Sequence, residues 1–89
     1  MAEITVKRLD DRTFEVTILE DGGSTTHEVT VEAADVDRLS GGTDAARLVE
    51  ASFLFLLDRE PKESILGRFE LSVISRYFPE YESRIGDYL

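Results

Sequence analysis

The stretch AARLVEASFLFLL, residues 45–57, is long enough for a helix and is apolar on nearly every side. A helix on the surface of a small domain normally keeps a wide polar face. Here the polar stripe consists of Arg47, Glu50 and Asp58 at helical spacing, and Leu54 lies in the middle of it. The pattern therefore predicts either a helix at the centre of the fold or a helix that meets another chain.

The composition predicts one small acidic domain over residues 1–89. Ten basic residues stand against nineteen acidic ones, which gives a formal net charge of −9. Such a charge repels phosphate backbones and anionic membrane surfaces, so nucleic acid and membranes are not expected as partners. The chain has no cysteine, which excludes disulfides and thiol chemistry. Because neither a secretory signal nor an apolar run of roughly 20 residues is present, we expect a cytoplasmic protein.

Residues 3–32 alternate between apolar and polar side chains and are expected to form a three-stranded antiparallel meander. A three-residue loop at 10–12 sets the first hairpin, and a loop centred on Gly22-Gly23 sets the second. The expected pairs are Val6–Val16 and Ile4–Ile18 in the first hairpin, and Glu20–Thr25, Ile18–His27, Val16–Val29 and Phe14–Val31 in the second. These registers place the large apolar side chains on one face of the sheet.

Residues 35–78 are expected to supply two or three helices that pack on this apolar face, which makes the fold α+β. A first helical turn at 33–39 precedes a Ser-Gly-Gly break. Thr43 is then placed as the N-cap of the central helix. Pro61 suits the first turn of a further helix, because a proline lacks the N–H that would be unpaired there.

The C-terminal third allows two interpretations. Residues 69–75 alternate like a strand but also fit a helix, and we expect a helix because Ile74, Tyr77 and Phe78 continue an apolar stripe at helical spacing. Pro79 ends that helix. The remaining residues, 79–89, are expected to form a polar C-terminal arm.

Little in the sequence supports catalysis, and an enzyme is not expected. His27 is the only histidine and is predicted to lie on the apolar face of the sheet. No serine lies in a GxSxG motif, and the paired acids Asp10-Asp11 and Glu20-Asp21 are expected to be solvated turn residues. We therefore predict no catalytic residue, no metal ligand and no cofactor.

A helix-turn-helix pattern at residues 63–78 provides an alternative. The segments SILGRF and SVISRYF flank a short break, and Arg68, Arg76 and Arg84 would form a basic edge. The second segment is apolar rather than suited to reading bases, and a basic footprint is the usual starting point for nucleic-acid binding. A regulatory or DNA-linked adaptor is thus the second hypothesis.

Two segments, SFLFLLDREPKESIL at 52–66 and ISRYFPEYE at 74–82, resemble segments of small uncharacterised prokaryotic proteins. The resemblance covers most of the chain. It implies a self-standing small domain, and it implies no activity, cofactor, partner or site residue.

The first hypothesis is a non-enzymatic protein-interaction module that forms a homodimer through the central apolar helix. A two-fold contact between identical surfaces is the commonest way to cover such a patch. Aromatic residues near the C-terminus are added because such side chains often anchor interfaces. The predicted interface residues are Phe53, Leu54, Leu57, Tyr81 and Tyr88.

Overall fold

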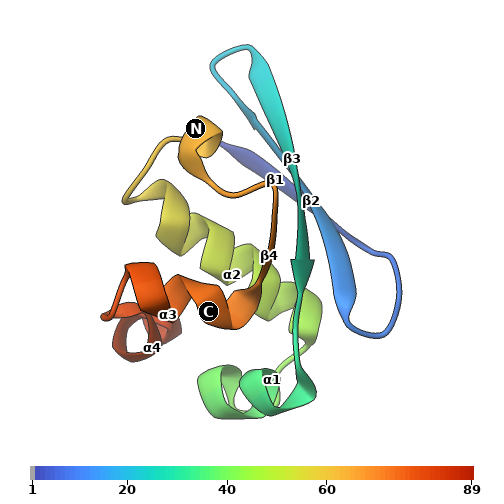
Figure 1. Cartoon of the computed structure of the whole chain (residues 1–89), viewed down its shortest axis with the longest axis vertical. Helices are drawn as coiled ribbons and strands as arrows, with labels where there is room; N and C mark the ends of the chain where they lie inside the picture. Colours follow the sequence, from blue (N-terminus) through green and yellow to red (C-terminus); the bar gives the residue numbers. More distant parts are fainter. Residues whose placement is uncertain (1) are drawn as a thin grey trace.

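The computed structural model describes residues 2–89 and shows a mixed sheet with helices on one of its faces (Figure 1). The alternating N-terminal segments form β1 (Glu3–Arg8), β2 (Thr13–Glu20) and β3 (Gly23–Thr30), which pair antiparallel. A fourth strand, β4 (Arg68–Glu70), joins β3 in parallel, so the strand order is β1-β2-β3-β4. The α+β class is confirmed. The three antiparallel strands are present as expected, but the sheet contains a fourth, parallel strand that was not predicted.

The register of the first hairpin is as predicted, and that of the second differs by two residues. Val6 pairs with Val16 and Ile4 with Ile18, whereas Phe14 pairs with Val29 and Val16 with His27. The second hairpin closes through a two-residue turn, Asp21-Gly22, instead of a longer loop. Both turn residues have positive φ (55° and 77°), which is the conformation of a tight type I′ turn. A shift of two residues keeps every side chain on its predicted face.

Helix α1 (Ala33–Ser40) and the long helix α2 (Ala45–Leu57) follow the antiparallel strands. The predicted N-cap, Thr43, is wrong by one residue. The carboxylate of Asp44 caps α2 by accepting a hydrogen bond of 3.1 Å from the Ala46 amide. The Thr43 hydroxyl instead donates to the Ser40 carbonyl, 3.0 Å away, and so closes the preceding turn.

The helix expected to begin at Pro61 does not form. The chain makes one 3₁₀ turn, η1 (Lys62–Ser64), and then extends into β4. The unpaired side of β3 favours this course, since the Glu28 amide donates a 2.8 Å hydrogen bond to the Gly67 carbonyl. A 3₁₀ turn, η2 (Leu71–Val73), and the short helix α3 (Ile74–Tyr77) follow.

Two predictions for this region therefore need correction. The helix expected at residues 69–75 is partly a strand, and only its second half is helical. The helix-turn-helix pair predicted at 63–78 is absent from this part of the structure, because its first helix is replaced by the 3₁₀ turn and β4.

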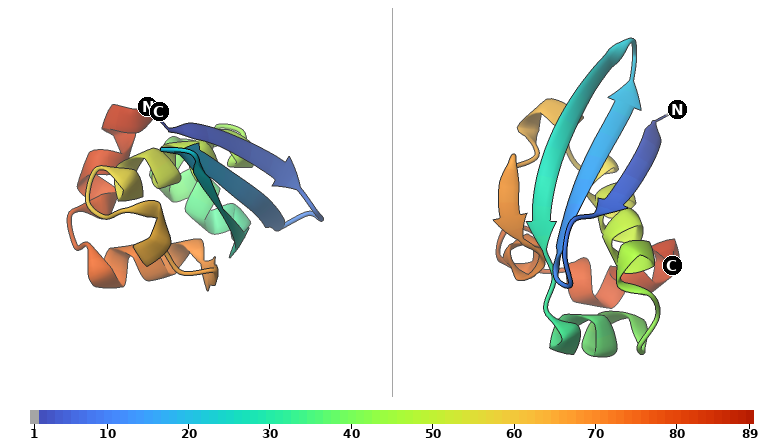
Figure 2. Two further views of the ribbon diagram at one scale, coloured as in Figure 1. Left: turned by 90° about the horizontal axis from the view of Figure 1, so that it is seen from above. Right: turned by 90° about the vertical axis from the view of Figure 1, so that its right-hand side faces the viewer.

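The C-terminal arm expected at 79–89 packs against α2, as the two views of Figure 2 show together. It contains α4 (Tyr81–Arg84) and the 3₁₀ turn η3 (Ile85–Tyr88). The side chains of Tyr81 and Ile85 are fully buried. Residues 2–89 thus contain four α-helices, where two or three were expected.

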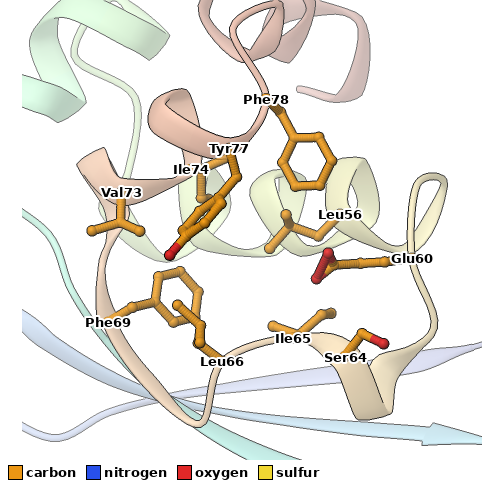
Figure 3. A pocket seen from close by; sticks show the side chains of 10 residues that line it. All are labelled: Leu56, Glu60, Ser64, Ile65, Leu66, Phe69, Val73, Ile74, Tyr77 and Phe78. Carbon is orange, nitrogen blue, oxygen red and sulfur yellow. The ribbon is translucent and has the colours of Figure 1, made fainter.

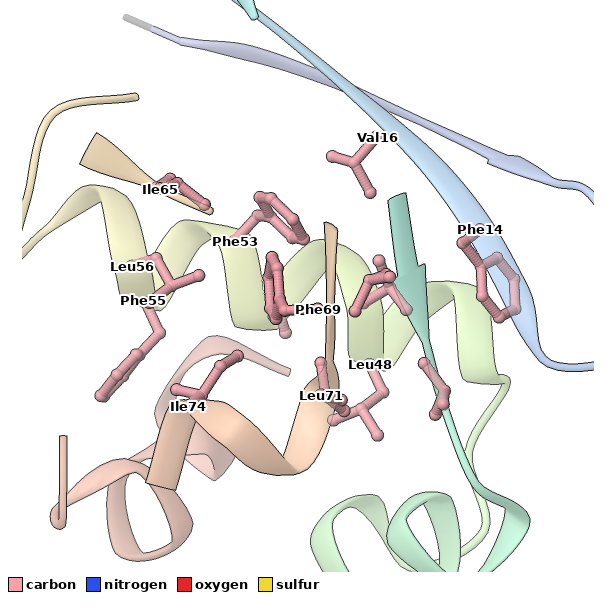
Figure 4. Close-up of a cluster of buried hydrophobic side chains, with 14 of the residues drawn as sticks. Phe14, Val16, Leu48, Phe53, Phe55, Leu56, Ile65, Phe69, Leu71 and Ile74 are labelled. Atoms are coloured by element: carbon pink, nitrogen blue, oxygen red, sulfur yellow. The ribbon is translucent and has the colours of Figure 1, made fainter. Parts of the chain in front are cut away.

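One hydrophobic core lies between the sheet and the helices (Figure 4). The sheet contributes Phe14, Val16 and Phe69, and α2 contributes apolar side chains around most of its circumference. The buried residues of α2 are Leu48, Val49, Ala51, Ser52, Phe53, Phe55 and Leu56. The C-terminal segment covers another side of α2 through η3. The prediction of a helix at the centre of the fold is therefore confirmed for all but the Leu54 side.

Candidate protein-interaction site

The five predicted interface residues separate by exposure. Phe53 and Tyr81 have no exposed area, so their assignment to a surface is wrong. Phe53 packs under the sheet beside Phe69, with ring centroids 5.9 Å apart, and Tyr81 closes the core at its C-terminal end. Leu54 keeps 40% of its surface exposed, as the polar stripe around it predicted. Leu57 and Tyr88 are partly buried.

Leu54 lies in a groove between β1, α2 and the C-terminus, which we call the Leu54 groove. It has a volume of about 600 Å³. Helix α2 packs mainly beneath β1, so the groove lies directly under the sheet margin. The lining residues are Val6, Asp44, Ala46, Arg47, Glu50, Ala51, Leu54, Tyr88 and Leu89. Apolar side chains and charged side chains of both signs thus line the groove, and the charged ones come from α2 and its N-cap.

The C-terminal wall of the Leu54 groove is fixed to α2 by polar contacts of Tyr88. Its hydroxyl donates a 2.6 Å hydrogen bond to the Asp58 carboxylate and accepts one of 3.3 Å from Arg59. The Arg59 guanidinium stacks on the Phe55 ring, 3.6 Å from its centroid, and pairs with Glu80 at 2.9 Å. The hydrogen bond from Arg59 lowers the pKa of the Glu80 carboxyl group. The groove therefore has a preformed wall.

A second cavity, of about 330 Å³, opens on another side of α2, between η1, β4 and α3 (Figure 3). Leu56, Ile65, Phe69 and other apolar residues line it, and Leu66 and Tyr77 at its margin are 47% and 67% exposed. Burial raises the pKa of Glu60, whose carboxylate faces this cavity. The size and the single acid suit a small apolar group that carries a hydrogen-bond donor.

The sequence did not reveal this second cavity. Tyr77 was predicted to continue the apolar stripe of a helix, but α3 is only one turn long and turns this ring outward. Leu66 was assigned to a helix that does not form. A signal for the exposure of Leu66 was available in the alternation around Phe69. If these residues form a strand, Leu66, Arg68 and Glu70 share the face opposite the buried Phe69.

His27 lies on the apolar face of the sheet, as predicted, and is only 3% exposed. Its Nδ1 lies 2.8 Å from the Leu66 carbonyl oxygen and must donate to it, because a carbonyl only accepts. Nε2 lies 2.8 Å from the Thr25 hydroxyl oxygen, within hydrogen-bond distance. The Nδ1 contact thus fastens the segment before β4 to the sheet, and the Nε2 contact lies within β3.

Within residues 2–89, no three His, Asp or Glu side chains are placed to hold a metal ion together. In the same part of the chain, no helix has the length and apolar character that crossing a membrane would require. Comparisons with known protein families, with curated proteins and with solved structures each find no match to this chain.

Proposed function

We propose that this chain is a non-enzymatic protein-interaction module that forms a homodimer through the Leu54 groove. The observation that carries the proposal is the exposed Leu54 side chain on a helix whose other apolar side chains are almost all buried. Leu54 lines the groove together with the apolar residues Val6 and Ala51. A second copy would cover this surface by a self-complementary two-fold contact.

The charges beside Leu54 support a second copy as the partner. Arg47 and Glu50 both line the groove, and neither takes part in an ion pair within residues 2–89. A surface with both signs of charge can pair with itself, whereas a molecule with a net charge of −9 otherwise favours basic partners. The cavity at Tyr77 has one acidic side chain and no basic one, so it lacks this self-complementarity.

The remaining polar groups support a role without catalysis. His27 uses both ring nitrogens within the fold. The buried Ser52 hydroxyl donates to the Leu48 carbonyl, at 2.7 Å, and is therefore engaged in α2 itself. Neither of these two groups is therefore free to act as a nucleophile or a base.

Substitution of Leu54 tests the proposal. We expect sedimentation equilibrium to give a wild-type mass that rises toward twice 10.0 kDa as concentration increases. Leu54→Asp should remain a folded monomer by circular dichroism, because a charged group replaces a side chain that is already 40% exposed. Tyr77→Asp is the matched control: it places the same charge on an even more exposed apolar residue, and it should leave association unchanged. A wild-type chain that stays monomeric up to millimolar concentration would refute the homodimer.

A further inference from the structure

Strand β1 forms an open margin of the sheet, directly above the Leu54 groove. The strand order puts β1 at one edge and β4 at the other, as the right-hand view of Figure 2 shows. Glu3, Thr5 and Lys7 are exposed on the outer face of β1, while Ile4 and Val6 are partly buried on the inner face. An exposed edge strand is a template for pairing with another chain.

The hydrogen-bond pattern shows which backbone groups of β1 are available. The Leu9 amide donates to the Thr13 carbonyl, 2.8 Å away, at the end of the first hairpin. Since bonding alternates along an antiparallel ladder, the odd-numbered residues of β1 bond to β2, and Ile4 and Val6 direct their N–H and C=O groups outward. The same alternation across the sheet predicts that the N–H and C=O groups of Glu28 on β3 point away from β2. The hydrogen bond from the Glu28 amide to the Gly67 carbonyl agrees with this pattern.

Only registers that bring outward-directed residues opposite each other can bond two copies of β1 across a two-fold axis. The registers centred on Ile4, on Thr5 and on Val6 meet this condition near the middle of β1. The register centred on Thr5 sets Glu3 opposite Lys7 twice, once on each side of the axis, and sets Ile4 opposite Val6. Registers centred on Ile4 or Val6 place Glu3 opposite Thr5 or Leu9, so no acid meets Lys7.

Side chains approach most closely in the antiparallel pairs that are not hydrogen-bonded to each other. Glu3 and Lys7 would form such pairs in the register centred on Thr5, which favours two interchain ion pairs. Neither residue takes part in an ion pair within residues 2–89. A lysine on an edge strand usually discourages pairing, but here this one register gives it an acidic partner.

The same arrangement brings the Leu54 grooves together. A two-fold axis between antiparallel strands of one sheet stands perpendicular to that sheet, so both copies keep their helices on the same face. Helix α2 packs mainly beneath β1, and the groove contains both Val6 and Leu54. Pairing of the edges therefore sets the exposed Leu54 side chains of the two copies toward each other across the axis.

From these observations, we propose that two copies of this chain join through antiparallel pairing of β1 with β1, with Glu3 opposite Lys7 and Thr5 on the axis. The two four-stranded sheets become one continuous sheet, and the α2 helices meet beneath the junction. This arrangement rests on the proposed homodimer and gives it a defined register.

Charge reversal on β1 tests the register by sedimentation equilibrium. In this register, Glu3→Lys places two lysines opposite each other on each side of the axis, and Lys7→Glu places two acids opposite each other. Each single variant should therefore raise the dimer dissociation constant about tenfold or more. The double variant restores opposite charges and should recover most of the affinity. Glu70→Lys, the same change on the exposed face of the opposite edge strand, is the matched control and should have no effect.

Amide hydrogen exchange supplies a second measurement. The amides of Ile4 and Val6 should become protected as the protein concentration rises, because they bond to the second copy only in the dimer. A dimer that Leu54→Asp dissociates, but that responds equally to Glu3→Lys and Glu70→Lys, would overturn the β1 register and leave the Leu54 homodimer standing. A monomeric wild type would overturn both proposals.

Discussion

The buried hydrogen bond between Ser52 and Tyr81 fastens the C-terminal segment to α2 and offers a sharp test of the fold. The two hydroxyl oxygens lie 2.6 Å apart, and both residues are fully buried. Ser52 uses its proton for the Leu48 carbonyl, 2.7 Å away. Tyr81 must therefore be the donor to Ser52. The two hydroxyls are thus unequal, and their removal should have unequal effects.

Ser52→Ala leaves the Tyr81 O–H buried without an acceptor. We expect this variant to lower the free energy of unfolding by about 2 kcal/mol, within the range for an unsatisfied buried donor. Tyr81→Phe removes the hydroxyl that donates to Ser52, but the Ser52 hydroxyl keeps its hydrogen bond to the Leu48 carbonyl. This variant should therefore lower the free energy of unfolding by only about 1 kcal/mol. The double variant removes the orphaned donor, so it should be no less stable than Ser52→Ala alone.

Urea denaturation followed by circular dichroism measures these differences, at one protein concentration because the proposed dimerisation would contribute to stability. If Tyr81→Phe proves more destabilising than Ser52→Ala, or if the two effects simply add, the inferred direction of the hydrogen bond is wrong.

Tyr81 also predicts a pH dependence at the alkaline end. Burial raises the pKa of its hydroxyl from 10.0 to about 12. The unfolded chain therefore loses this proton at lower pH than the folded chain does, so stability is retained below pH 10 and falls between pH 10 and 12. The full loss amounts to about 2 to 3 kcal/mol. Tyr81→Phe should lack this component of the decline, and an unchanged decline would show that Tyr81 is not its source.

Two further substitutions test the groove wall and the hairpin. Arg59→Ala removes the stack on Phe55 and the contacts to Glu80 and Tyr88, so urea denaturation should show a free energy of unfolding lower by about 1 to 2 kcal/mol. The control is Arg84→Ala, whose ion pair is long and exposed. It should change the free energy of unfolding by less than about 0.5 kcal/mol. Gly22→Ala forces a side chain into positive φ at 77° and should destabilise by about 1 kcal/mol, while Gly67→Ala, with ordinary φ and no atom within 4 Å of the added Cβ, should be close to neutral.

Local patterns were sufficient to predict the order of strands and helices over the first two-thirds of the chain. Alternation over β1 and β2 and the short loop between them fixed one register, because a one-residue shift would expose Val16 and Ile18. The second register was missed by two residues, since the sequence Asp-Gly-Gly contains two overlapping turn signals and either choice keeps the same face. The structure selects the tighter turn at Asp21-Gly22.

The C-terminal third could not be read in the same way because its structure depends on distant partners. Residues 68–70 become a strand because β3 offers them an unpaired edge, and no local signal reveals that edge. Tyr81 was predicted to be an interface residue because aromatic side chains near the C-terminus often anchor interfaces. Its burial depends on Ser52, 29 positions away, which supplies an acceptor inside the core.

The excess apolar character of α2 is now accounted for on three sides. The sheet covers one side, the segment of β4 and α3 covers another, and the C-terminal turns cover a third. The side that holds Leu54 stays open, and it lies beneath β1, whose backbone is also unpaired along its outer edge. One partner placed on this side could form hydrogen bonds with the unpaired backbone groups of β1 and also cover the exposed Leu54 side chain. A second copy would meet that requirement with Glu3 and Lys7 in complementary positions, and for this reason the proposed interface combines the open edge with the exposed leucine.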